Sequence, residues 1–475
     1  MKPLQDYLRF DNGLSSASEP DAEAVPLMIV SQTSQKPFID SLASHQQGWL
    51  TIHGFTGKPA SVTTIPDQHG QLAMAVVIVG KTPQWDIAKA AQTLPGCIFS
   101  ANIEFADETD IRDVQLGWGL AQYEFAPHKP ERAAKARLKL PDGEFDTGVD
   151  ALLLGIFLCR EMINQPANIM TPQGIEDICQ MVADSLSADC TVTKGKALEI
   201  YGPAVHVVGR AAEIPPRIID MRWGDEGPMI TLVGKGVSFD SGGLDIKPSR
   251  GMEIMKKDMG GAAHVLGLAV ALMASHQKIR LRVMIGAAEN AISEKSMRPL
   301  DVIKTAAGID VEVGNTDAEG RLILADLLHH AMNDDSDKPD FMLDFATLTG
   351  AARIALGTEC PALFANHDKM AQAFVAQGFA IDDPLWQMPL FDKYDRQLDT
   401  GQAGLSSTGP SGYGGAITAA LFLRRFVGRE VNWGHIDVMA WNLSSNPGRP
   451  KGGEAMGLRA AYHLIVSGDY NNHSG

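Results

Sequence analysis

In the second half of the sequence, short apolar runs of strand length alternate with longer segments of helical character. The strand-like runs are Met229 to Val233, Leu281 to Ile285, Phe341 to Phe345 and His435 to Met439. Helical patterns cover Ala262 to Ala274 and Leu322 to Met332. Strands that alternate with helices indicate a mainly parallel sheet with helices on both faces. The pattern therefore predicts an α/β fold for the larger part of the chain.

The first part of the chain predicts a second, smaller α/β unit. Its strand-like runs are Val25 to Val30, Trp49 to His53 and Leu72 to Val79, followed by a helical segment near Asp86 to Leu94. A helix from about Thr147 to Asn164 is expected to bridge the two halves. With 475 residues the chain is too long for one average domain. We therefore expect an N-terminal domain at residues 1–148, a linker helix at 149–167 and a larger C-terminal domain at 168–475.

Composition and charge argue against several classes of protein. The formal net charge of −16 argues against sequence-independent binding of nucleic acid, which depends on Lys and Arg neutralising phosphates. No apolar run reaches the roughly 20 residues that a membrane-spanning helix needs, and the first ten residues lack the apolar core of a signal peptide. The five cysteines are scattered and form no CxxC pair, which is typical of a reducing compartment. We expect a cytoplasmic protein without a membrane segment.

The run Asn315 to Leu322 places two acids, Asp317 and Glu319, two residues apart, with Arg321 two residues further on. Further charged side chains stand in nearby glycine-rich segments: Lys235, Asp240, Lys247 and Asp258. Lys235 follows the strand predicted to end at Val233, Asp258 precedes the helix predicted to open at Gly260, and the octapeptide leads into the helix near Leu322. Such positions converge beyond the carboxyl ends of strands, where α/β sheets bind ligands. Four carboxylates, two lysines and an arginine in this arrangement look like a two-metal hydrolytic site.

The residue types allow a more specific hypothesis. Four carboxylates balance the charge of two divalent ions, whereas any single one could equally be solvated or cap a helix. Oxygen ligands favour Mn²⁺ or Mg²⁺, although carboxylate-rich zinc sites also exist. Lys235 could coordinate a metal only as a neutral amine. Lys247 is better suited to remain protonated and face a developing oxyanion, and Arg321 offers a planar fork to an anion.

With these residues assembled, the chain closely resembles the leucine (cytosol) aminopeptidase family of dinuclear metallopeptidases. The octapeptide matches the family's signature without a substitution. Further matching segments are Val233 to Gly243, Ile246 to Ser249, Lys257 to Ala263, Ala346 to Ala351, Asn164 to Pro172, Gly414 to Ala420 and Trp433 to Asp437. The likeness covers roughly residues 150 to 445. In this family the N-terminal part is variable and associated with the oligomer, and the C-terminal domain is catalytic.

The resemblance implies a ligand set for two metal ions, Mn²⁺ or Zn²⁺, with Mg²⁺ as a further candidate. Lys235, Asp240, Asp258 and Glu319 resemble the ligands of the more tightly held ion. Asp240, Asp317 and Glu319 resemble the ligands of its more exchangeable neighbour, so that Asp240 and Glu319 would bridge the two.

The resemblance also implies catalytic and binding roles. Lys247 and Arg321 resemble the two catalytic cations, and Arg321 would hold a bicarbonate that acts as general base, helped by backbone groups near Gly320 and Leu348. The pocket for the first residue would be lined by Met255, Thr347 and Gly350. These residues suit leucine or another apolar residue. A water that bridges the two metals would attack the peptide.

The leading interpretation is thus a cytoplasmic aminopeptidase, active on short peptides with a free N-terminus, in a homohexamer like others of the family. Two alternatives remain. A two-metal phosphatase could use the same cations to clamp a phosphoryl group. A hexameric scaffold or nucleic-acid-binding regulator could retain the fold without the activity.

Overall fold

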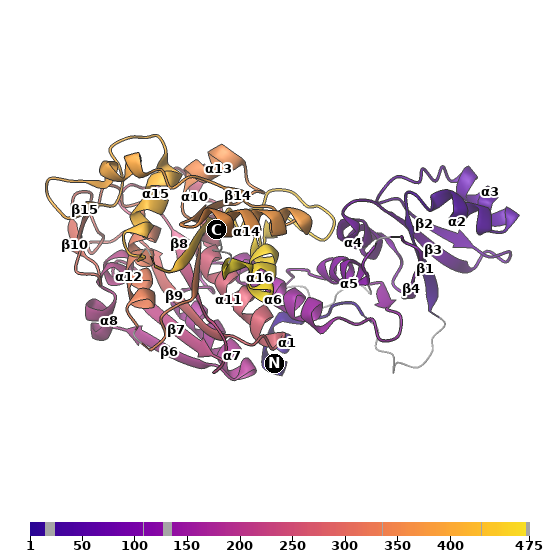
Figure 1. Cartoon of the computed structure of the whole chain (residues 1–475), viewed down its shortest axis with the longest axis horizontal. Coiled ribbons are helices and arrows are strands. Elements are labelled where there is room, and N and C mark those ends of the chain that lie inside the picture. The colour runs from indigo at the N-terminus through magenta and orange to yellow at the C-terminus, as the bar shows by residue number, and fades with distance from the viewer. Residues whose placement is uncertain (15–23, 108, 127–134, 335, 429, 472–475) are drawn as a thin grey trace. The chain divides into compact units, whose positions relative to one another are not determined.

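The computed structural model describes residues 1–14, 24–107, 109–126, 135–334, 336–428 and 430–471. The chain divides into two compact units. The larger unit comprises Met1–Leu8, Leu154–Leu443 and Gly452–Gly475, and the smaller comprises Arg9–Leu153 and Ser444–Lys451. Figure 1 labels their elements.

The smaller unit is built on a five-stranded sheet in the order β2-β3-β1-β4-β5. These strands are β1 (Val25–Ser31), β2 (Val62–Pro66), β3 (Leu72–Val79), β4 (Ile98–Phe105) and β5 (Arg137–Lys139). All neighbours are parallel except β2 and β3. The predicted strands at Val25 and Leu72 are confirmed, and their near-continuous apolar sequence is typical of strands covered on both faces.

Helices cover both faces of this sheet. They are α2 (Gln35–Ser41), α3 (Ser44–Ile52), α4 (Pro83–Thr93) and α5 (Ile111–Leu120). The prediction of a strand at Trp49 to His53 is wrong, because these residues lie in or just after α3. Leu50 is buried in a core cluster with Val30 and Val76, and Trp49 Nε1 donates to the carbonyl of Thr64 at 2.9 Å. Packing of a helical face thus outweighs the strand propensity of Trp, Thr and Ile.

The larger unit contains an eight-stranded sheet in the order β14-β13-β16-β12-β8-β9-β7-β6. Its strands are β6 (Asp189–Lys194), β7 (Arg217–Trp223), β8 (Met229–Asp240), β9 (Arg280–Asn290), β12 (Phe341–Ala346), β13 (Ala362–Ala365), β14 (Trp386–Gln387) and β16 (Asn432–Asp437). The four central strands β16, β12, β8 and β9 are mutually parallel. The predicted mixed α/β fold with a mainly parallel sheet is confirmed.

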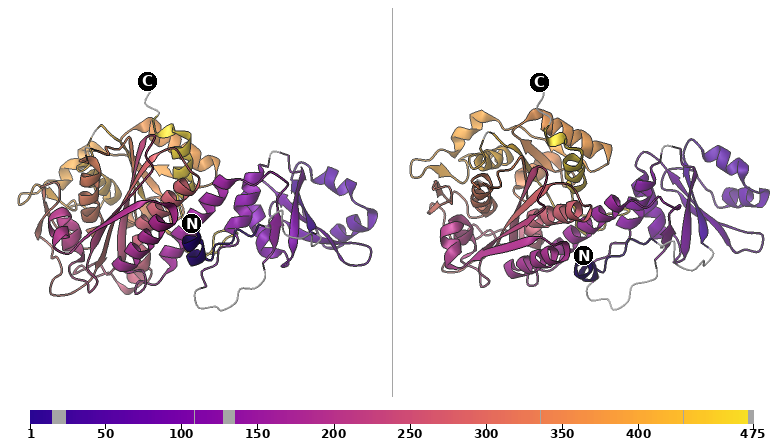
Figure 2. Two further views of the ribbon diagram at one scale, coloured as in Figure 1. Left: turned by 90° about the horizontal axis from the view of Figure 1, so that it is seen from below. Right: turned by 60° about the horizontal axis from the view of Figure 1, so that its bottom comes forward.

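Helices surround the sheet on both sides, as both views of Figure 2 show. The long helices are α6 (Thr147–Asn164), α7 (Pro172–Leu186), α11 (Gly260–Ala274), α12 (Glu319–Met332), α14 (Asp368–Ala380), α15 (Gly415–Arg424) and α16 (Leu458–Ser467). Helix α6 has the predicted bounds. Alternate residues of the central strands divide the helices between the faces: a Cβ at Gly234 would meet Val265 of α11, and one at Gly286 would meet Ile323 of α12.

Short elements complete the larger unit. They are α1 (Lys2–Leu8), α8 (Lys196–Tyr201), α9 (Pro203–Gly209), α10 (Ser249–Met252), η1 (Met255–Met259), β10 (Val302–Lys304), β11 (Asp310–Glu312), α13 (Gly350–Leu356), η2 (Asp392–Leu398), β15 (Leu405–Ser406), β17 (Trp441–Asn442), β18 (Gly452–Gly453) and η3 (Asp469–Asn471). Of the described helices, none combines the length and the apolar character that crossing a bilayer requires.

Candidate metal centre

The central strand β8 supplies two of the candidate ligands. It was predicted to end at Val233, which is wrong: it continues to Asp240 and therefore contains Lys235 as well. The glycines at 234 and 236 suggested a loop, but the strand pairs with β9 from Met229 to Val237 and, after a shift in register, ends opposite Asn290. Glycine is required at 234 because a Cβ would lie 2.6 Å from the side chain of Val265. Lys235 and Asp240 are thus fixed by the backbone of a buried sheet.

Asp258 reaches the same place from the short helix η1, directly before α11. The start of α11 packs against the strands at very short range, since a Cβ at Gly261 would lie 2.1 Å from the carbonyl oxygen of Phe345 and 2.8 Å from the amide nitrogen of Lys235. No side chain fits there. The glycines that precede the apolar helix therefore position Asp258 against Lys235.

Asp317 and Glu319 come from the turn and the first residue of α12, which begins three residues earlier than predicted. Thr316 holds this turn, because its hydroxyl donates to the carbonyl of Gly242 at 2.7 Å and its N–H donates to Asp245 at 2.8 Å. The two glycine-rich segments of the sequence are thereby joined directly.

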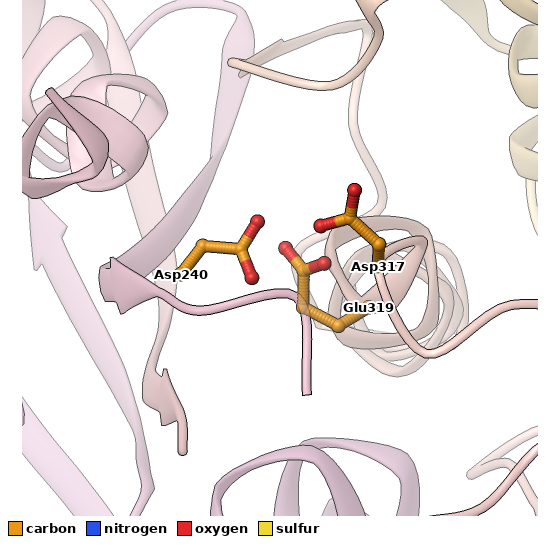
Figure 3. A group of neighbouring side chains, drawn as sticks. All are labelled: Asp240, Asp317 and Glu319. Carbon is orange, nitrogen blue, oxygen red and sulfur yellow. The ribbon is translucent and has the colours of Figure 1, made fainter. Parts of the chain in front are cut away.

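The carboxylate oxygens of Asp240, Asp317 and Glu319 converge, with one oxygen of each lying within 4.8 Å of the others. Figure 3 shows the three side chains pointing toward one another. Lys235 Nζ lies 2.8 Å from Asp258 and 2.9 Å from Glu319. The structure therefore brings together all five predicted metal ligands.

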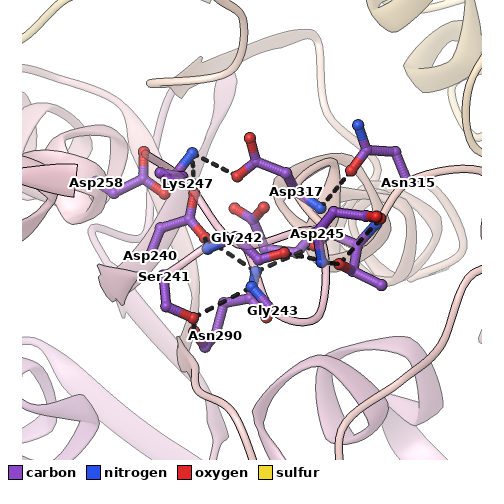
Figure 4. A network of polar contacts seen from close by, with 12 residues as sticks. Asp240, Ser241, Gly242, Gly243, Asp245, Lys247, Asp258, Asn290, Asn315 and Asp317 are labelled. Carbon is purple, nitrogen blue, oxygen red and sulfur yellow. Dashed lines mark hydrogen bonds and ion pairs between the residues drawn. The ribbon is translucent and has the colours of Figure 1, made fainter. Parts of the chain in front are cut away.

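Lys247 reaches both Asp240 and Asp317, as the network in Figure 4 shows. Its Nζ is 2.8 Å from Asp240 and also forms an ion pair with Asp317. Burial lowers the pKa of Lys247, but the charge and hydrogen bond of Asp240 and the contacts with Asp317 outweigh burial, and the net pKa is raised. Lys247 is therefore protonated, as the sequence predicted for a group that faces negative charge.

The electrostatics of the cluster indicate a surplus of negative charge. Burial and the neighbouring Asp240 raise the pKa of Glu319 to about 8 and that of Asp317 to about 6. Burial lowers the pKa of Lys235, yet the charges of Asp258, Glu319 and Asp240 raise the net value above the ordinary one. Among the described residues, no group donates a hydrogen bond to Glu319 Oε2. A buried carboxylate oxygen without a donor fits a site made for cations.

Arg321, two residues after Glu319, is 7% exposed. One of its terminal nitrogens donates to the carbonyl of Ser407 at 2.7 Å, while no described residue accepts from its Nε. Burial lowers the pKa of Arg321 to about 10, so it remains charged at neutral pH. The guanidinium thus has a free donor for an anion. The N–H of Leu348 donates to Asp437 at 3.0 Å, so an anion near Arg321 would have to share that donor.

Of the three residues predicted for a first-residue pocket, Met255 is near Asp258 in the sequence and Thr347 contacts it in space. Met255 is in η1, three residues before Asp258, and is 8% exposed. Thr347 is buried, and its hydroxyl donates to Asp258 at 2.8 Å. Gly350 is exposed at the first residue of α13. Thr347 therefore also positions a candidate metal ligand, which the amino-acid sequence did not indicate.

Several residues of the site were missed from the sequence. Asn290 donates to Asp240 at 2.9 Å and to the carbonyl of Thr316 at 3.1 Å. Asp437 accepts from the N–H of Thr349 at 3.1 Å and from its hydroxyl at 2.6 Å. Both stand at the carboxyl ends of strands that flank β8 or β12. Strand position within an α/β pattern was the signal that could have found them.

Comparisons with known proteins agree with this geometry. The model of the cytosol aminopeptidase family, catalytic domain, matches residues 157–462, and the model of the M17 aminopeptidase N-terminal domain matches residues 25–141. A probable cytosol aminopeptidase of Methylorubrum populi is 35% identical over 423 residues, which cover 83% of this chain and 84% of that protein. The chain belongs to the cytosol aminopeptidase family. It is accordingly a hydrolase of the metallopeptidase class.

Solved structures extend the likeness to the whole fold. A cytosol aminopeptidase from Coxiella burnetii is 42% identical with a TM-score of 0.90, covering 95% of this chain and 99% of that one. The bottromycin maturation enzyme BotP, in complex with Mn, is 28% identical with a TM-score of 0.86, covering 94% of this chain and 100% of that one. A mutant tomato leucine aminopeptidase is 27% identical with a TM-score of 0.81, covering 96% of each chain.

Proposed function

We propose that this protein is a dinuclear metal-dependent aminopeptidase that releases leucine or another apolar residue from the N-terminus of short peptides. The observation that carries the proposal is the convergence of Asp240, Asp317 and Glu319 beside the pairs that Lys235 makes with Asp258 and Glu319. Four carboxylates supply the charge for two divalent ions.

The ligands divide between two ions. Lys235, Asp240, Asp258 and Glu319 would hold one, and Asp240, Asp317 and Glu319 would hold the other. Mn²⁺ suits these oxygen ligands, and its presence in BotP supports it, while Zn²⁺ remains the other candidate. Lys235 must lose a proton to coordinate a metal, so metal binding at this site releases protons.

When bound, two such ions supply an activated water and polarise the scissile carbonyl. The protein's own residues do the rest. Lys247, protonated and partly exposed, would donate to the oxygen that becomes negative during attack. Arg321 would hold a bicarbonate through its unpartnered Nε, with backbone groups near Gly320 and Leu348, and that base would take the proton and return it to the leaving amine. The turn that Thr316 fixes would keep Asp317 and Glu319 in place throughout.

The substrate preference follows from the pocket. Met255, the methyl group of Thr347 and the open backbone at Gly350 would accept an apolar side chain. The names of the relatives support a cytosolic location, and we propose a homohexamer, as the sequence resemblance implies. In such an assembly the N-terminal unit would serve the oligomer and the C-terminal unit the catalysis.

The test uses metal-stripped protein with leucine p-nitroanilide while Mn²⁺ is added. Saturable hydrolysis that a chelator abolishes is the expected result. N-Acetyl-leucine p-nitroanilide is the matched control and should resist cleavage, because its blocked amine cannot bind metal. Hydrolysis of p-nitrophenyl phosphate without hydrolysis of the leucine substrate would instead favour the two-metal phosphatase and refute the proposal.

A further inference from the structure

A short loop lies directly against two of the proposed metal ligands. It comprises Thr347, Leu348 and Thr349 and joins β12 to α13. The carbonyl oxygen of Thr347 accepts from Lys235 Nζ at 3.0 Å, and the Thr347 hydroxyl lies 2.8 Å from the carboxylate and 2.9 Å from the carbonyl oxygen of Asp258. Lys235 and Asp258 are the two ligands that we assign to one ion alone. The position of this loop therefore determines the orientation of both.

The contact with Thr347 is important for a lysine that binds a metal. As a neutral amine, Lys235 keeps two N–H groups and has one lone pair for the ion. An N–H that donates to the Thr347 carbonyl fixes the rotation of the amine, so it also fixes the direction of the lone pair. Groups that support a metal ligand in this way typically change metal affinity by about 10- to 100-fold.

Asp437 holds the loop in place from the neighbouring strand. It is the last residue of β16, opposite Ala346 of β12, and is 3% exposed. Its Oδ1 accepts from the N–H groups of Leu348 at 3.0 Å and Thr349 at 3.1 Å, and its Oδ2 accepts from the Thr349 hydroxyl at 2.6 Å. Among the described residues, these are the only groups that donate to its carboxylate. All its hydrogen bonds within that part of the chain thus go to the loop.

The contacts of Asp437 differ from those of a helix cap. Helix α13 begins at Gly350, and Thr349 already caps it, because its hydroxyl accepts from the N–H of Ala352 at 3.1 Å. Asp437 instead binds two N–H groups that precede the helix, so it fixes the path of the loop. Burying a carboxylate is costly unless such charge-assisted hydrogen bonds offset the cost. The loop is therefore the part of the molecule that this buried charge serves.

We propose that Asp437 is a positioning residue of the metal centre, which acts through the loop on Lys235 and Asp258. The inference rests on the proposed function and deepens it, because it assigns the control of one ion to a residue that is not itself a ligand. The other ion would be held by the remaining carboxylates of the cluster. None of these forms a hydrogen bond with the loop in the part of the chain that the structure describes. Loss of Asp437 should therefore weaken one ion and leave the other nearly unchanged.

Two substitutions separate the position of the Asp437 side chain from its charge. Asp437→Asn keeps the shape and can keep all three contacts, with the amide oxygen accepting from the two N–H groups and the amide nitrogen donating to the Thr349 hydroxyl. Asp437→Glu keeps the charge but lengthens the side chain by one carbon–carbon bond of about 1.5 Å, which displaces the loop.

The measurement is equilibrium binding of Mn²⁺ to the metal-stripped protein, which does not depend on activity. We expect Asp437→Glu and Asp437→Ala to bind one ion about 10- to 100-fold more weakly, as is typical when the support of a ligand is lost. Asp437→Asn should retain the affinity for both ions, because the loop keeps its position.

Asp383→Ala is the matched control. Asp383 is also a buried carboxylate, and it accepts from three backbone N–H groups, those of Gly457, Arg459 and Ala460, at 2.8, 2.9 and 3.1 Å. These groups lie at the start of α16 rather than in the loop, so the variant should lose stability without losing metal affinity. The free energy of unfolding of each metal-free variant, measured with denaturant, shows whether the two losses of stability are comparable.

A double substitution tests the route from Asp437 to the ligands. Thr347→Val removes the hydroxyl beside Asp258 and should weaken the same ion. Combined with Asp437→Ala, it should lose less affinity than the sum of the two single losses, because both changes then break the same contact. Fully additive losses would overturn the inference, since Asp437 would then not act through Thr347.

The possible failures are distinguishable. Unchanged affinity in Asp437→Ala, or an equal loss in Asp437→Asn, overturns the inference and leaves the proposed function intact, because position would then not be what Asp437 supplies. Equal weakening of both ions, or the same loss in Asp383→Ala, also overturns it, because the effect would then be general. If Asp437→Ala does not fold, the comparison of Asp437→Glu with Asp437→Asn decides. Unmodified protein that binds no Mn²⁺ refutes the proposed function and this inference with it.

Discussion

Replacing Gly320 with alanine should weaken metal binding while leaving the fold almost as stable as before. Gly320 is the second residue of α12 and lies against the side chain of Lys235. An alanine Cβ would lie 2.6 Å from Cε, 2.7 Å from Cδ and 2.8 Å from Nζ of that lysine. Carbon atoms in contact are separated by about 3.5 Å or more, so the lysine must retreat by about 0.9 Å.

That displacement is small for a fold and large for a metal site. Alanine in a helix is favoured over glycine by about 1 kcal/mol, while overpacking costs about 1–3 kcal/mol. The free energy of unfolding should therefore change by no more than about 2 kcal/mol. Metal–ligand distances tolerate only about 0.2 Å, so Lys235 should cease to coordinate. We expect the affinity of the ion that it holds to fall by at least about 10- to 100-fold, the range seen for weaker supporting contacts.

Two assays check this prediction. Equilibrium binding of Mn²⁺ should show one weakened ion in Gly320→Ala, and hydrolysis of leucine p-nitroanilide should require correspondingly more metal. Gly48→Ala is the matched control, because Gly48 also lies in a helix and a Cβ there would meet nothing within 4 Å. Wild-type metal affinity and activity in Gly320→Ala would refute Lys235 as a ligand.

Three further predictions concern Lys247, the protons of the metal site and the buried His264. Lys247→Met should lower kcat by about 100- to 1000-fold with little change in KM, because Lys247 acts on charge that develops during the reaction; an unchanged kcat would contradict this. At pH 7, Mn²⁺ binding should release protons, because the pKa of Glu319 is raised to about 8 and that of Lys235 is also raised. Calorimetry in buffers of different ionisation enthalpy measures this release. A heat of binding that is the same in every buffer would contradict the prediction. Burial lowers the pKa of His264 from 6.5 to about 4, so its contribution to stability is present above pH 6.5 and is lost as the pH falls toward 4, by about 3 kcal/mol. In His264→Gln the free energy of unfolding, measured with denaturant, should fall less steeply over that interval, and an equal slope would exclude His264 as the cause.

Much of the fold was predictable because the central strands are covered on both faces. Such strands are apolar along their length, and runs such as Leu72 to Val79 indicate them directly. The prediction from apolar runs failed at the end of β8, because the sequence of Gly234 and Lys235 is typical of a loop. Glycine is needed at 234 because α11 packs closely against the strand there. A contact between segments that are distant in the chain leaves no local pattern in the sequence.

The candidate site was likewise predictable only in part from the sequence. Glycine-flanked acids such as Asp317 and Glu319 were evident from their spacing, and the structure brings them together with the rest of the predicted ligands. Their catalytic and ligand roles remain predictions. Asn290 and Asp437 were not evident, because each acts on a partner that the sheet brings near from another strand.

The central claim is that five side chains of this protein bind two metal ions. Anomalous diffraction from crystals grown with Mn²⁺ tests it most directly. The account predicts two peaks about 3.5–4 Å apart, both bound by Asp240 and Glu319, one also by Asp317 and the other by Asp258 and Lys235. A single peak, or two peaks elsewhere with Lys235 still paired to Asp258 and Glu319, would contradict it.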